Sequence, residues 1–199
     1  MDLFVATCLK MFFIMTPFFV LSVFLTMTSD ATTNEKKTLA IKVTLSVIVI
    51  SLVLLFFGKH IFEVFGITLD AFRIGAGALL FLSAVELIRG SKDGQKLDAD
   101  NIQDIAVVPL AIPITIGPGT VGILLVMGAG FKSALTLFIG SFALICSVSL
   151  IGLMLYFSHV IIKVVGRQGL LIVSKITGLF LAALSAQTMF TGIRNFLNM

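Results

Sequence analysis

The sequence predicts an all-α membrane protein with six transmembrane helices. Of its 199 residues, 58% are hydrophobic and only 12% are charged, which lies outside the range of soluble globular domains. The mean hydropathy is +1.15. Apolar runs of about twenty residues, the length that crosses a bilayer as a helix, recur between short charged stretches. What remains between the runs is too short for a soluble domain.

The apolar runs define the expected spans, which cover residues 5–27, 40–58, 69–89, 105–128, 132–157 and 173–195. The longest polar stretch between them, 91–104, is expected to be a cytoplasmic loop. It divides the chain into a first three-helix repeat, 1–90, and a second, 105–199. Asp2 and Lys10 do not fit a cleaved signal peptide, so the first span is expected to be retained.

The basic residues predict the orientation of the spans. The loops after spans one, three and five hold most of them: Lys36, Lys37, Lys42, Arg89, Lys92, Lys96, Lys163, Arg167 and Lys175. The opposite side holds the fewer remaining ones: Lys10, Lys59, Arg73, Lys132 and Arg194. Because cytoplasmic loops are enriched in Lys and Arg, both termini are expected on the periplasmic side.

The two halves of the sequence resemble each other at an offset of 102 residues. Arg73-Ile74 and 82–84 (Leu-Ser-Ala) match Lys175-Ile176 and 184–186. With a slip of one residue, Pro17 in span one matches Pro118 in span four. Halves with three spans each have opposite orientations, so the match predicts a 3+3 inverted repeat, with a site near the midplane. Chance similarity between apolar segments is the alternative.

Spans one and four contain residues that interrupt a helix. Span four carries Pro109, Pro113 and the sequence Gly117-Pro118-Gly119-Thr120, and span one carries Thr16-Pro17. Proline has no N–H and clashes with the carbonyl four residues before it. In a membrane, the freed backbone groups are tolerated where they are buried in protein or line a wet cavity. Both helices are therefore predicted to be broken, although a simple kink remains an alternative for Pro17.

A broken helix presents N–H groups at one end and carbonyls at the other, and these can hold a zwitterion. The predicted solute-binding residues lie at the two breaks and in spans three and six: Thr16, Pro17, Pro113, Gly117, Pro118, Gly119, Thr120, Ser83, Ser185 and Gln187. The last three could instead join helices by hydrogen bonds. Glu86 is the best candidate for a titratable coupling group, with an ion pair to Arg89 or Lys92 as the alternative. No catalytic or metal-ligand pattern is present.

The stretch from Val108 to Thr120 resembles the MarC family of bacterial inner-membrane proteins, whose hallmark is a PLAxPxxxGPG sequence in the fourth span. The resemblance extends through 65–67, 72–77 and 191–193. It implies a protein grouped with neutral amino acid transporters and similar to LysE-type exporters. The family's span-one motif, NPxGxxP, is altered here: Thr16 stands in place of Asn, Phe18-Phe19 interrupts the glycine position, and Ser22 stands near the second proline.

These observations predict a secondary transporter of a small neutral or zwitterionic solute, with amino acids favoured, that works by alternating access. The alternatives are an exporter of amino acids or small metabolites, and a non-transporting scaffold or regulatory protein. The expected partners are the lipid bilayer, the solute and a coupling ion (H⁺ or Na⁺). Neither a cofactor, a metal, a nucleic acid nor an enzymatic activity is expected. A homo-oligomer is left open.

Overall fold

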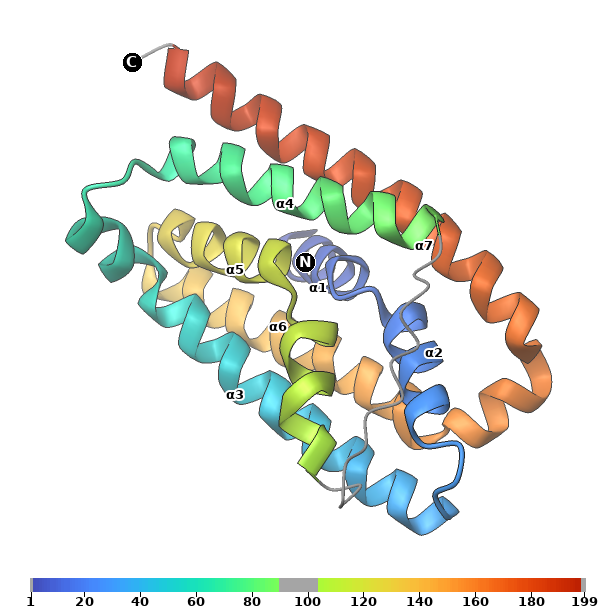
Figure 1. The fold of residues 1–199 in the computed structure, drawn as a ribbon. Helices are drawn as coiled ribbons and strands as arrows, with labels where there is room; N and C mark the ends of the chain where they lie inside the picture. The colour runs from blue at the N-terminus through green and yellow to red at the C-terminus, as the bar shows by residue number, and fades with distance from the viewer. Residues whose placement is uncertain (1, 90–103, 198–199) are drawn as a thin grey trace.

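The computed structural model describes residues 2–89 and 104–197, in which every regular element is a helix (Figure 1). The elements are α1 (Asp2–Ile14), α2 (Pro17–Met27), α3 (Thr33–Phe65), α4 (Leu69–Arg89), η1 (Asp104–Ala106), η2 (Val107–Thr115), α5 (Pro118–Gly130), α6 (Ala134–Tyr156) and α7 (Ser158–Leu197). The predicted loop 91–104 lies outside the described residues except for Asp104, which begins η1.

The helices have the lengths and composition of a multi-pass membrane protein. By these criteria α3, α4, α6 and α7 can each cross a bilayer. Two further pairs qualify when each is counted as one span, namely α1 with α2, bent by 41°, and η2 with α5, bent by 69°. The all-helical fold and a total of up to six spans are therefore confirmed, and the two bends fall where the prolines predict broken helices.

Two helices extend well beyond the apolar runs that predicted them. α3 begins at Thr33 because Thr32 and Glu35 form a capping box, in which the Thr32 hydroxyl accepts the Glu35 N–H and the Glu35 carboxylate accepts the Thr32 N–H. α7 begins at Ser158 and changes direction at Gly166, whose φ of 70° favours glycine. Hydropathy locates the apolar part of a helix, whereas caps and glycines determine where the helix begins.

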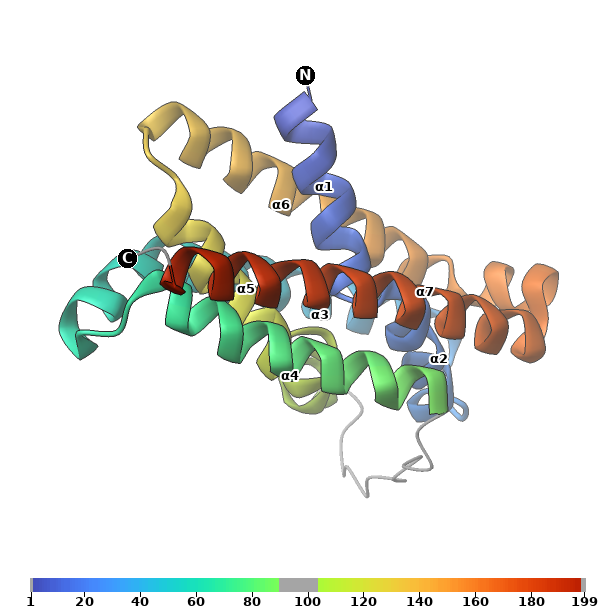
Figure 2. The same cartoon turned by 90° about the horizontal axis from the view of Figure 1, so that it is seen from above.

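The two bent elements lie between two pairs of long helices (Figures 1 and 2). α4 packs along α7, and α3 packs against α6. α1–α2 contacts α6 and α7, while η2–α5 contacts α3 and, through α5, α4. The Ser147 hydroxyl on α6 donates to the Cys8 carbonyl on α1 at 2.7 Å. The bends in both elements therefore lie inside the helical bundle.

Glycines let the helix backbones approach closely around α5. A Cβ on Gly119 would lie 2.7 Å from the Leu80 Cα on α4, and one on Gly122 would meet Ala76 on the same helix. Membrane helices use small residues in this way because dispersion contacts between close backbones hold them together. The outer surface carries large apolar side chains such as Phe138 and Phe190, each 71% exposed, as expected of a surface in contact with lipid.

Candidate solute cavity at the broken helices

The first break is built around Thr16, which is only 8% exposed and adopts the left-handed conformation, with φ 48° and ψ 57°. Pro17 has no N–H, so the carbonyl of Phe13 accepts the N–H of Thr16 instead, at 3.1 Å. The Thr16 carbonyl then accepts the N–H groups of Phe19 and Val20 in the first turn of α2. One residue thus ends α1 and begins α2.

The second break follows from the residues that precede prolines. Val108, Ile112 and Gly117 each stand before a proline, and all three are extended, the geometry that a following proline ring favours. The Ile116 N–H reaches back to the Ala111 carbonyl at 2.9 Å, and the buried Thr115 hydroxyl donates to the Leu110 carbonyl at 2.7 Å. These bonds satisfy carbonyls that a regular helix would have paired, so the irregular segment is stable inside the bundle.

A cavity of about 260 Å³ lies between the two breaks and α4. It brings together six of the predicted site residues: Thr16, Ser83, Pro113, Gly117, Pro118 and Thr120. Glu86 lines the same cavity, and no ion pair joins it to another described residue. The cavity therefore combines hydroxyl groups, the opening turn of α5 and one carboxylate, which is a set of groups that can bind both ends of a zwitterion. We call it the central cavity.

The other four predicted residues lie elsewhere. Pro17 is buried in the first turn of α2, and Gly119 faces the backbone of Leu80. Ser185 is fully buried, and its hydroxyl donates to the Ala182 carbonyl at 2.7 Å. Gln187 lines a different cavity. Sequence alone did not separate these positions, because all of them lie on the same helices or breaks as the residues that line the central cavity.

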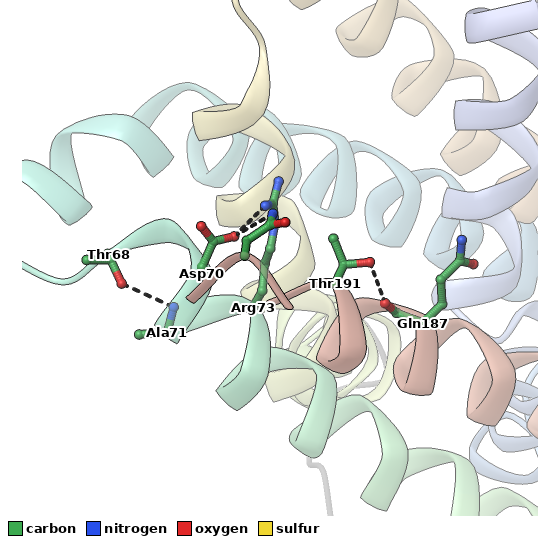
Figure 3. A network of polar contacts seen from close by, with 7 residues as sticks. Thr68, Asp70, Ala71, Arg73, Gln187 and Thr191 are labelled. Atoms are coloured by element: carbon green, nitrogen blue, oxygen red, sulfur yellow. Dashed lines mark hydrogen bonds and ion pairs between the residues drawn. The ribbon is translucent and has the colours of Figure 1, made fainter. Parts of the chain in front are cut away.

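Sequence reasoning also missed a larger cavity, of about 660 Å³, where α1, α5 and α7 meet the start of α4. Lys10, Arg73 and Lys132 line it together with Gln187 and Thr188. Arg73 forms an ion pair with Asp70 at 2.6 Å, and the Asn195 amide donates to the same carboxylate oxygen at 3.3 Å (Figure 3). In the sequence, Lys10 was placed inside the first apolar run, and Arg73 and Lys132 at the edges of spans. We call this space the basic cavity.

A model of the MarC family of integral membrane proteins matches residues 1–197. The chain belongs to the MarC family. Among its relatives, a UPF0056 membrane protein of Methanocaldococcus jannaschii is 34% identical over 155 residues, which is 75% of this chain and 68% of the relative. One from Aquifex aeolicus is 35% identical over 150 residues, covering 70% and 68% of the two chains. No solved structure matches the protein.

The left-handed geometry of Thr16 suits asparagine, the residue that the resemblance to the MarC family implies at this position. A β-branched residue is unfavourable in the left-handed conformation, whereas asparagine tolerates it. We therefore expect Thr16→Asn to stabilise this MarC protein by about 1 kcal/mol, since the left-handed conformation costs an ordinary residue roughly 1–2 kcal/mol. The midpoint of thermal unfolding in detergent measures the change.

Thr26→Asn is the matched control for this prediction. Thr26 is an exposed residue inside α2 with ordinary helical geometry, and its hydroxyl donates to the Ser22 carbonyl. The same substitution there should change stability by less than about 0.5 kcal/mol. Equal effects at Thr16 and Thr26 would contradict the backbone explanation.

Proposed function

We propose that this MarC protein is a secondary transporter of a small neutral or zwitterionic solute, with amino acids the favoured class. The observation that carries the proposal is the central cavity, which is bounded by both broken helices. Its volume, about 260 Å³, is below the roughly 300–1,000 Å³ typical of pockets for drug-sized ligands, so a small solute fits best. We place the protein in a bacterial inner membrane with both termini periplasmic, and we expect no enzymatic activity.

In this proposal the solute is held mainly by backbone and hydroxyl groups. Gly119 and Thr120 lie in the first turn of α5, where N–H groups have no partner within their own helix and carry partial positive charge. A solute carboxylate would bind there, close to the Thr16 and Thr120 hydroxyls. The Glu86 carboxylate would face the ammonium group, and it is the residue we assign to coupling with H⁺.

The packing of the helices supports an inverted repeat. When the two halves are exchanged, the contact of α2 with α7 becomes that of α5 with α4, and the contact of α1 with α6 becomes that of η2 with α3. The contact of α2 with α6 likewise becomes that of α5 with α3, whereas the contact of α1 with α7 has no comparable counterpart between η2 and α4 among the described residues. Glu86 and Thr188, which are 102 residues apart, line the central and the basic cavity respectively. Two cavities related in this way suit alternating access, in which the halves rock around a central site.

The scaffold alternative has less support than transport. It requires the break to be filled by the bulky residues of span one, Phe18 and Phe19. Phe18 instead packs edge-on against Phe12, with ring centroids 6.4 Å apart, and Phe19 forms part of the cavity wall. The exporter alternative uses the same cavity and differs only in the direction that the gradients impose.

The test is counterflow and uptake of radiolabelled neutral amino acids in proteoliposomes, under pH and sodium gradients. We expect exchange above that of protein-free liposomes. With Glu86→Gln, uptake driven by a pH gradient should fall further than exchange without a gradient, because the amide weakens binding of the ammonium group in both assays but abolishes proton coupling only in the first. If no amino acid moves in either direction under any gradient, transport of amino acids is disproved.

A further inference from the structure

The basic cavity lies at the opposite end of α4 from Glu86. Arg73 and Glu86 are separated by thirteen helical positions, or about 20 Å along the helix axis. The wall is formed by α1, the start of α4, the end of α5, the start of α6 and the second half of α7. Lys132 lies between α5 and α6. The basic cavity is therefore a separate space, larger than the central cavity and with a different set of charges.

The charges in the basic cavity do not balance among the described residues. Arg73 is the only one of the three cations with an ion pair there, to Asp70. Lys10 and Lys132, both of which are exposed, form no ion pair within residues 2–89 and 104–197, so the cavity holds two cations without an acidic partner there. Three cations around one space repel each other, and their cost rises where membrane and protein reduce the local dielectric constant. A bound anion would relieve that repulsion.

We propose that the basic cavity is a binding site for an anionic group, a carboxylate or a phosphate. The Lys10 and Lys132 ammonium groups supply charge and donors, and the Gln187 amide adds neutral donors. The hydroxyls of Thr188 and Thr191 already donate to the carbonyls of Leu184 and Gln187, so they do not add donors. Figure 3 shows Gln187 and Thr191 on α7 beside Arg73 on α4.

The anionic group could belong to a soluble molecule or to a lipid headgroup, and both present the same chemistry to the cavity. The site is distinct from the solute cavity at the broken helices. Its occupation is a binding equilibrium that can be measured whether or not the protein transports anything.

The protein offers a clean fluorescence probe for this site. It contains no tryptophan, and Leu3, which lines the basic cavity, is 44% exposed. Leu3→Trp therefore places a single reporter in the wall. In phosphatidylcholine nanodiscs at constant ionic strength, titration with succinate or inorganic phosphate should give a saturable fluorescence change. With Lys10→Gln and Lys132→Gln added, the Kd should increase about tenfold, because charge-assisted hydrogen bonds are lost.

Matched variants separate this site from general surface charge. Lys175 on α7 occupies the position equivalent to Arg73 in the other repeat, is exposed and lies outside the basic cavity. Lys175→Gln should therefore leave the Kd unchanged. Lys132→Gln alone changes only a residue between helices, so it reports on the site even if the double variant does not fold; about a threefold increase in Kd is expected.

Nanodiscs that contain phosphatidylglycerol distinguish the two sources of the anion. If succinate and phosphate bind as tightly as in phosphatidylcholine, the ligand is a soluble anion. If phosphatidylglycerol weakens their binding and the lysine variants abolish that competition, the ligand is a lipid headgroup. Either result supports the site. A linear, non-saturable response, or the same Kd with and without the two lysines, would overturn it, and neither outcome depends on amino acid transport.

Discussion

Gly128→Ala is expected to destabilise the protein by about 3 kcal/mol, at the upper end of the range for overpacked interiors. A Cβ at this position would collide with the carbonyl oxygen of Leu55 on α3, and the Leu55 carbonyl carbon would be only 2.8 Å away. Both are backbone atoms of a helix, so no side-chain rotation relieves the clash. α3 and α5 must separate, and close contacts along this interface, which also supports the second break, are lost.

Thermal unfolding in detergent measures this effect. Cys8 and Cys146 are free, so a thiol-reactive dye can report when the helices separate. For a chain of this length, 3 kcal/mol corresponds to a decrease in Tm of about 6–12 °C. Gly130→Ala, in the same helix, is the matched control, because a Cβ at Gly130 would have no neighbour within 4 Å. This variant should change stability by less than about 0.5 kcal/mol. Similar Tm values for the two variants would refute the close α3–α5 contact.

The breaks could be predicted from sequence because their causes are local. Pro17 and Pro113 interrupt helical hydrogen bonding wherever they stand, and a residue before proline is displaced from helical geometry, as Ile112 is. The span of α4 was predicted at its observed bounds, because its apolar run ends at a charged residue, Arg89. The start of α7 was not predicted, because the segment of mixed composition before its apolar run is also helical.

The direction in which a polar side chain points could not be predicted in the same way. Ser83 and Ser185 occupy equivalent positions in the two halves, and both hydroxyls are bonded to their own helix, yet Ser83 borders the central cavity while Ser185 is fully buried. Which neighbours surround each serine is set by the contacts of α4 and α7 with the other helices. Such contacts join residues that are far apart in the chain, so no local pattern contains them.

The basic cavity was missed for the same reason. Lys10 and Lys132 are separated by more than half of the sequence, and neither alone indicates a shared site. Lys10 falls inside the first apolar run, and Lys132 begins the fifth. Counting them together predicted orientation but not proximity. Packing of α1, α5 and α7 around the start of α4 places them in one wall, where their repulsion becomes an argument for a ligand.

Ser83→Phe is expected to lower amino acid exchange by tenfold or more while leaving the protein folded. Ser83 borders the central cavity, and its hydroxyl is bonded at 3.1 Å to the Leu79 carbonyl of its own helix, so it ties no two helices together. A benzyl group there would occupy much of a cavity of about 260 Å³. Overlap with the solute that costs about 1.4 kcal/mol already gives a tenfold loss of binding. Gly119 is a poor site for the same experiment, because any side chain there would press on the backbone of Leu80.

Leu82→Phe is the control, since Leu82 is the preceding residue on α4, is 58% exposed and does not line the central cavity. Both variants place a phenyl ring in the same turn of one helix. Exchange should be retained in Leu82→Phe and lost in Ser83→Phe, with equal Tm values within about 2 °C, as for differences below 1 kcal/mol. Equal exchange rates would remove the central cavity from the pathway, because a solute that passes between the two broken helices cannot avoid the ring at Ser83.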